Sequence, residues 1–275
     1  MTGCGTALDE RIDEDLLALN QKATALLPQF FEGVQMEQLG NMPVRFGEAW
    51  VSYLAAEIYG AADTALIAIV HNRGRQARIL ERQMYEMMIK AHYYIENEDD
   101  ARLEYLALPF RDLEFQQQMQ WDQQAPRYVE AANAVQKVAQ QFPDVAVYVQ
   151  KNTREKSVRQ MVGESKDQDA IREYAFHYRR LSQTPHGAIL GMFDVLDLRP
   201  DGNIGIRFDS RLDDPNFAIQ NMTLYVITFL ELVDEVFALG RGAEIEALKS
   251  ESEATLARLW PDAYREEHPD EPMPR

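Results

Sequence analysis

The sequence predicts an all-α protein, a helical bundle with one small peripheral β-hairpin near residues 198–209. Apolar residues recur every three or four positions through most of the 275-residue chain, and proline or glycine separates the periodic segments. An Asp201–Gly202 turn between two short alternating runs predicts the hairpin. Because no fixed-period repeat or Gly/Ser-rich linker interrupts the chain, we expect a single helical domain over residues 1–260, with its motif-bearing core at about 43–239.

Six helices are expected in the first half of the chain. Their ranges are Leu8–Leu27, Phe30–Leu39, Pro43–Val70, Arg75–Asn97, Glu98–Gln124 and Tyr128–Phe142. Pro28 and Gly40 mark the ends of the first two, and Pro109 is expected to kink the fifth, since proline removes a backbone donor and crowds the preceding turn. Val145–Val149 alternates weakly and fits either a short strand or a helical turn.

The second half of the chain is expected to be helical on both sides of the hairpin. The ranges are Ser157–Gly163, Asp167–Gln183, a helix from Pro185 toward Phe193, Asn216–Leu239 and Ala243–Trp260. Pro185 ends one helix and begins the next, with Thr184 as the N-cap. The acidic, proline-containing tail at residues 261–275 is expected to be mobile.

The composition is that of a globular protein of the cytoplasm. Cys4 is the only cysteine, so a reducing compartment is expected, and the absence of an apolar leader argues against secretion. The longest apolar stretch, Met222–Leu239, carries three acidic residues and is predicted to be a buried helix, not a membrane span. The net charge of −17 argues against broad nucleic-acid binding, although His71–Arg82 contains four arginines and one acidic residue.

The segment Tyr174–Gly187, YAFHYRRLSQTPHG, gathers most of the chemically useful side chains. His186 is expected in the first turn of a helix, where free N–H groups and the helix dipole attract phosphate and favour a neutral imidazole. Arg179 and Arg180 lie across the break at Pro185 and can supply positive charge, and Ser182 can contact a substrate or bond back into its own helix. Alternatively, His186 is a capping or core histidine.

A second motif, RQARILERQMYE, spans Arg75–Glu86. Arg78 and Arg82 are four residues apart, as are Arg82 and Glu86, so these side chains project from one helix face. Arg82 and Glu86 form either a partly exposed ion pair or the wall of a polar pocket, in which Glu86 orients Arg82 or His186.

Other chemistries have weaker support in the sequence. A di-iron bundle needs two Glu-x-x-His motifs, whereas the nearest pairs, His92/Glu96 and Glu173/His177, are spaced by four. There is also no Walker loop, dinucleotide fingerprint, zinc spacing or Gly-x-Ser-x-Gly elbow. We therefore expect no metal and no cofactor, with a carboxylate metal bundle as the weakest alternative.

Two resemblances follow from these motifs. Residues Arg75–Glu86 and His177–Gly187, with the hairpin and the apolar helix after them, resemble an uncharacterised bacterial helical family of unknown function over about Pro43–Leu239. More distantly, Arg180-x5-His186 (or Arg179-x6-His186) is similar to the Arg-x(4–6)-His signature of the HEPN superfamily, although Leu181 stands where HEPN nucleases often have a polar residue. That superfamily contains helical, usually dimeric domains, many of them metal-independent ribonucleases of toxin–antitoxin and phage-defence systems.

The HEPN resemblance implies a ribonuclease with defined residue roles. His186 would be the general base on an RNA 2′-hydroxyl, Arg180 would stabilise charge on the phosphate, and Glu86 would orient or share protons with them. The substrate would be held by Arg78, Arg82, Arg179 and Ser182. The resemblance further implies a homodimer and an antitoxin or other protein partner. The alternative is a non-catalytic helical binding module, with a polar pocket for a small anion or a protein partner and a structural His186.

Overall fold

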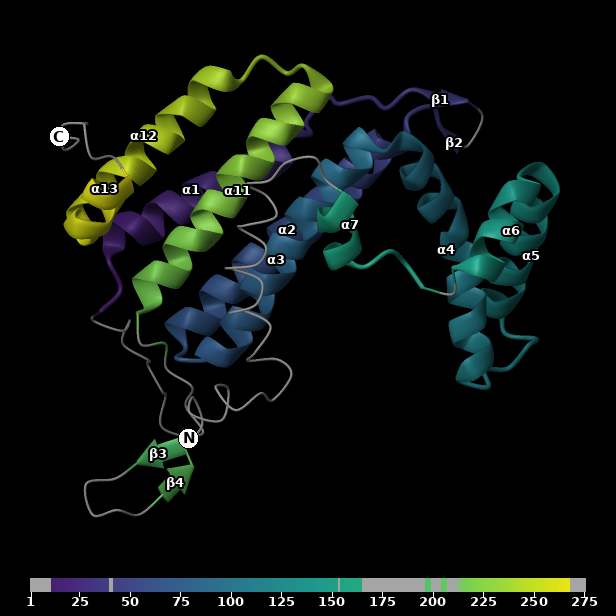
Figure 1. Cartoon of the computed structure of the whole chain (residues 1–275), viewed down its shortest axis with the longest axis horizontal. Helices are drawn as coiled ribbons and strands as arrows, with labels where there is room; N and C mark the ends of the chain where they lie inside the picture. The colour runs from purple at the N-terminus through teal and green to yellow at the C-terminus, as the bar shows by residue number, and fades with distance from the viewer. Residues whose placement is uncertain are drawn as a thin grey trace. The chain divides into compact units, whose positions relative to one another are not determined.

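A computed structural model describes residues 11–39, 42–152, 154–164, 196–198, 204–206, 212 and 214–267. These residues are almost entirely helical (Figure 1). The helices are α1 (Glu14–Phe30), α2 (Phe46–Val70), α3 (Gly74–Glu96), α4 (Glu98–Gln118), α5 (Pro126–Gln141), α6 (Pro143–Lys151), α7 (Val158–Glu164), α11 (Pro215–Phe237), α12 (Gly242–Leu259) and α13 (Pro261–Glu267). The all-α class is therefore confirmed.

The strands form two short antiparallel hairpins. Strand β3 (Leu196–Leu198) pairs with β4 (Ile204–Ile206), which confirms the hairpin predicted from the Asp201–Gly202 turn. Strand β1 (Gln38–Leu39) pairs with β2 (Met42–Pro43) and was not predicted.

The chain divides into two compact units. Unit 1 contains Met1–Gln35, Ser52–Ile89 and Asp167–Arg275, and unit 2 contains Met36–Val51 and Lys90–Lys166. Helices α2 and α3 each contribute residues to both units. The single domain expected over residues 1–260 stays a prediction.

The core of unit 1 is built by α1, α11 and α12, which lie side by side (Figure 1). Helix α11 begins at Pro215, where the Asp214 carboxylate accepts a hydrogen bond from the Phe217 N–H, and it buries an apolar stripe against α1. Two polar contacts cross this core: Asn20 Nδ2 donates to Thr223 Oγ1 over 3.0 Å, and Gln220 Nε2 donates to Ser252 Oγ over 2.8 Å. Buried polar pairs of this kind fix the register of the helices.

Unit 2 is built on the packing of α4, α5 and α6, together with the first residues of α2. The Trp50 indole stacks on Tyr94 at 4.8 Å between ring centroids and donates to the Ala101 carbonyl over 2.9 Å. The Glu98 carboxylate accepts hydrogen bonds from the N–H groups of Phe46 and Gly47, two of the unpaired donors at the start of α2. Residues distant in sequence therefore define where α2 begins.

Several predicted boundaries in the first half of the chain are wrong. The helix expected over Phe30–Leu39 does not form: α1 continues through Pro28 to Phe30, and Gly33 adopts a left-handed φ of 85° before strand β1. Pro43 lies in β2, and α2 starts three residues later at Phe46.

Other boundaries differ after the middle of α4. This helix contains Pro109 and ends at Gln118, six residues before the predicted end, because Gln120 has a left-handed φ of 53°. Val145–Val149 is helical, inside α6. The tail expected to be mobile begins with a helical segment, α13. The helices expected over Asp167–Gln183 and from Pro185 toward Phe193 lie outside the described residues.

Among the residues described, α2 alone is long and apolar enough to cross a membrane by length and composition. Its most apolar window has a mean hydropathy of 1.4, and half of that window is buried within the protein. Buried core helices meet the same criteria, so this is weak evidence for a span.

Candidate functional site

Helix α3 carries a row of charged side chains, here called the charged stripe, which consists of Arg75, Arg78, Arg82 and Glu86. Their spacing of three, four and four residues places them on one side of the helix. The opposite side of α3 carries the buried Ala77 and Met84. All four members of the charged stripe are half-buried, so this is not an ordinary solvated helix face.

The Arg82–Glu86 pair predicted from the sequence is confirmed. Arg82 Nε lies 2.8 Å from Glu86 Oε1, and the two side chains are 14% and 26% exposed. An ion pair on an open helix surface contributes well under about 1 kcal/mol, whereas reduced exposure to water strengthens the interaction and also makes each charge costlier to leave unpaired. The Arg82–Glu86 ion pair is therefore partly covered by the protein and has a fixed orientation.

Glu81, in the same motif, is a buried acid that the sequence analysis missed. Its side chain is 4% exposed and accepts a hydrogen bond from Asn221 Nδ2 of α11 over 2.9 Å. One turn further along α3, the ring of Tyr85 packs on that of Tyr225 at 5.5 Å. These contacts fix the rotation of α3 in unit 1, and the charged stripe with it. The only sign of this buried acid in the sequence is that Glu81 occupies a position on the apolar side of the helix.

The remaining predicted site residues lie outside the described residues. These are the base His186, Arg180, Arg179 and Ser182. The structure therefore places Arg78, Arg82 and Glu86 on one helix face, while their convergence with His186 and Arg180 stays a prediction.

Unit 2 contains a charged cluster that the sequence analysis did not predict, centred on Lys156. Lys156 Nζ donates to Tyr93 Oη at 2.6 Å, Asp100 Oδ2 at 2.7 Å and Glu164 Oε2 at 2.8 Å. Tyr93 Oη also lies 2.7 Å from Glu164 and makes a very short contact with Asp100. Lys156 thereby joins residues of α3, α4 and α7.

These contacts shift the pKa values so that the charges of the cluster are held fixed. Burial, reinforced by the hydrogen bond to Asp100, raises the pKa of Tyr93 above its usual range. Burial, the largest single influence, would lower the pKa of Lys156 and raise that of Asp100, but the hydrogen bonds and opposite charges of the cluster together outweigh it and move each pKa in the opposite direction. A neutral tyrosine, a protonated lysine and an ionised aspartate stabilise the fold and are not poised to exchange protons near pH 7.

A second group of charged residues adjoins the cluster through Glu104. Glu104 is 1% exposed and accepts a hydrogen bond from the Tyr148 hydroxyl over 2.6 Å. Arg111 Nη1 lies 2.5 Å from Glu104 Oε2, an ion pair. Glu155 accepts from Lys90 at 2.9 Å and from the Tyr94 hydroxyl at 3.1 Å. The four-residue spacing of Asp100 and Glu104 was the only sequence sign of the cluster.

The described residues include no group of three or more His, Cys, Asp or Glu side chains arranged to hold a metal ion. His92 is exposed on α3.

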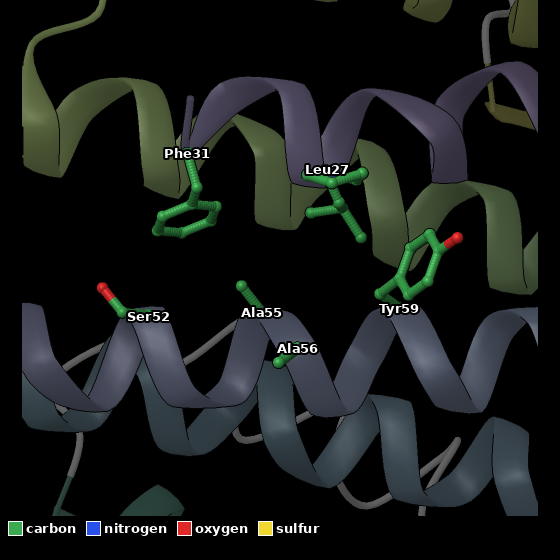
Figure 2. Close-up of a pocket in the computed structure, with 7 residues that line it drawn as sticks. Leu27, Phe31, Ser52, Ala55, Ala56 and Tyr59 are labelled. Atoms are coloured by element: carbon green, nitrogen blue, oxygen red, sulfur yellow. The ribbon is translucent and has the colours of Figure 1, made fainter. Parts of the chain in front are cut away.

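Unit 1 also contains an apolar pocket between α1 and α2 (Figure 2). Its volume is about 360 Å³, and it is lined by Leu27, Pro28, Phe31, Ser52, Ala55, Ala56 and Tyr59. Leu27 of α1 and Phe31, the residue that follows α1, point toward the small side chains of α2. This lining has few polar atoms, unlike the polar pocket considered from the sequence.

The fold and the charged stripe define an all-α protein with a partly covered cationic helix face. Residues 48–204, more than half of the chain, match the family of unknown function DUF5677, and the chain belongs to this family. The match includes the charged stripe, the Lys156 cluster and the segment Tyr174–Gly187. No curated protein and no solved structure matches. The expected membership of an uncharacterised helical family is confirmed, and the HEPN resemblance stays a prediction.

Proposed function

We propose that this chain is a metal-independent endoribonuclease of the HEPN type, acting as a toxin or phage-defence effector. The observation that carries the proposal is the charged stripe of α3. Arg82 is oriented by Glu86 at 2.8 Å, while Arg78, half-buried one turn away, makes no ion pair with any described residue. An arginine whose charge is not neutralised by a neighbour is suited to bind a phosphate oxygen.

The negative charge of the whole protein limits where nucleic acid can approach the charged stripe. At a net charge of −17, most of the surface repels nucleic acid. Three arginines and one acid in the charged stripe form a local excess of positive charge, through which a polyanion can approach. Such a surface favours contact with a short single-stranded segment over wrapping of a long duplex.

The proposed reaction assigns each residue a role. His186 takes the proton from an RNA 2′-hydroxyl, the 2′-oxygen attacks the adjacent phosphorus to form a 2′,3′-cyclic phosphate, and the bond to the 5′-oxygen breaks as that oxygen takes up a proton from water. Arg180 stabilises the negative charge that develops on the phosphate, and Glu86 orients Arg82 or His186. Arg78, Arg179 and Ser182 contact the substrate. A correctly placed general base contributes roughly 10²–10⁴ in rate.

The partners follow from the same proposal. The substrate is RNA, the working unit is a homodimer in the cytoplasm, and an antitoxin or other protein controls the activity. Two copies of a short Arg/His motif would form one basic cleft in an otherwise acidic protein.

Single substitutions in α3 test this function. Glu86→Gln keeps the size of the side chain and removes the charge that orients Arg82, so we expect cleavage of single-stranded RNA in EDTA to slow at least tenfold. The matched control is Glu244→Gln, which removes the acid of an exposed Arg241–Glu244 pair on α12 and is expected to leave the rate unchanged. Equal rates for wild type and Glu86→Gln, at equal melting temperatures, would exclude the role assigned to Glu86.

The second candidate is a non-catalytic binding module that holds a small anion. The half-buried Arg78, which has no ion pair among the described residues, favours this function as well, because anion binding needs no general base. A wild-type protein that binds RNA or inorganic phosphate but never cleaves RNA would support the binding module against the ribonuclease.

A further inference from the structure

The apolar pocket of unit 1 is part of a longer exposed surface on α2. Tyr53, Tyr59 and Ile67 are 56%, 44% and 52% exposed, and they lie on the outward side of this helix. The exposed Ala56 and Gly60 lie among them, and a Cβ added at Gly60 would meet nothing within 4 Å. Contiguous exposed apolar side chains around a pocket mark binding surfaces on soluble proteins.

The pocket has the size and shape to receive a few large apolar side chains. Its volume of about 360 Å³ falls at the lower end of the usual range for binding pockets, roughly 300–1,000 Å³. Leu27 and Phe31 form one wall and the small Ala55 and Ala56 form the other, which leaves a groove along α2 (Figure 2). Grooves between two helices bind amphipathic helices through apolar anchors one turn apart.

The exposed charges on and next to the elements that form the groove are acidic. Glu57 and Asp63 are exposed on α2, and the exposed Glu32 directly follows Phe31 of the pocket wall. None of these three acids forms an ion pair with a described residue, and α2 contains no lysine or arginine over its whole length. Asp63 follows Tyr59 by four residues and so lies on the same helix face as the pocket lining. A ligand of this groove therefore gains from positive charge beside its apolar residues.

The same charges argue against other occupants of the groove. A second copy placed with α2 against α2 would bring Glu57 and Asp63 toward the same acids, and like charges at short distance are repulsive. A membrane surface rich in anionic lipid would be repelled in the same way.

We infer that this groove is a docking site for a cationic amphipathic helix of a partner protein. The apolar side of the helix enters the pocket between α1 and α2, and its lysine or arginine residues lie beside Asp63. The inference goes beyond the proposed ribonuclease and does not depend on it, because no member of the charged stripe lines the groove.

A pair of synthetic peptides provides the test. Both are helices of about five turns with one leucine face, and the polar face is lysine in one and glutamate in the other. Calorimetric titration of the full-length protein is expected to show at least tenfold tighter binding of the lysine peptide, decreasing as salt is raised.

Two variants locate the binding site. Ala56→Trp fills the mouth of the pocket and is expected to weaken binding of the lysine peptide at least tenfold, whereas Ala243→Trp, at an exposed alanine on α12, is not. Asp63→Lys reverses a charge beside the groove and is also expected to weaken binding. Its control, Asp262→Lys on α13, changes the net charge of the protein by the same amount.

Three results would overturn the inference. The first is that the protein binds the two peptides with equal affinity. The second is that Ala56→Trp and Asp63→Lys leave binding of the lysine peptide unchanged, although both variants have the melting temperature of the wild type. The third is a dimer that Ala56→Trp alone converts to monomer, which would assign the groove to a second copy of this chain.

Discussion

Lys156 shows most clearly how single residues stabilise unit 2. Its side chain is 22% exposed, and its ammonium group contacts Tyr93, Asp100 and Glu164 within 2.8 Å. Charged groups at this degree of burial are costly to leave unpaired, because the remaining carboxylates lose their partner and regain only part of their hydration. The periodicity of a sequence shows which face of a helix is buried but not which charges meet there. For that reason the Arg82–Glu86 pair, which is local, could be predicted, and the Lys156 cluster could not.

We predict that Lys156→Met lowers the free energy of unfolding by about 1–3 kcal/mol. The loss comes from three hydrogen bonds and from the unpaired charge of Asp100. Urea unfolding followed by circular dichroism measures it. Lys137→Met is the control in the same unit, because Lys137 is exposed on α5 and makes no ion pair with a described residue, so a change within about 0.5 kcal/mol is expected. Similar losses in both variants would show that the cluster contributes nothing beyond a surface lysine.

At the scale of the elements, long amphipathic helices were predictable and their junctions were not. The ends of α3 and α12 lie within one residue of the predicted ends, since both helices have a clear apolar period. The start of α2 was placed at Pro43, a frequent first residue of helices. The observed start at Phe46 depends instead on the Glu98 carboxylate, which is distant in sequence and binds the first N–H groups of α2.

The two glycines of α2 give a matched prediction for this junction. A Cβ at Gly47 would lie 2.8 Å from the carbonyl oxygen of Tyr94, so Gly47→Ala is expected to destabilise the protein by about 1–3 kcal/mol. At Gly60 a Cβ meets nothing within 4 Å, and Gly60→Ala is expected to stabilise the helix by up to about 1 kcal/mol. Thermal unfolding compares the two variants. If both substitutions stabilise the protein, the close approach of α2 to Tyr94 is wrong.

At the scale of the whole molecule, the fold class was predictable and the division into two units was not. Both units consist of the same kind of amphipathic helix, and two of the four points at which the chain passes between them lie inside α2 and α3, where no linker marks the boundary. Of the candidate site, the described residues test only the local part, the charged stripe; the part on Tyr174–Gly187 stays a prediction.

A homodimer is the prediction at this scale. The proposed site combines two short Arg/His motifs, and the acidic surface of each copy leaves few places for an anionic substrate other than a shared basic cleft. Light scattering at micromolar concentration should give about twice the chain mass of 31.6 kDa. A mass equal to that of one chain would contradict both the dimer and the shared cleft.

The ribonuclease proposal is tested most directly by cleavage of single-stranded RNA in EDTA, comparing wild type with His186→Ala at matched melting temperatures. We predict that the wild type cleaves without metal and that the variant loses about 10²–10⁴ in rate while remaining folded. No cleavage by the wild type, or the same rate for His186→Ala, would contradict the proposed function.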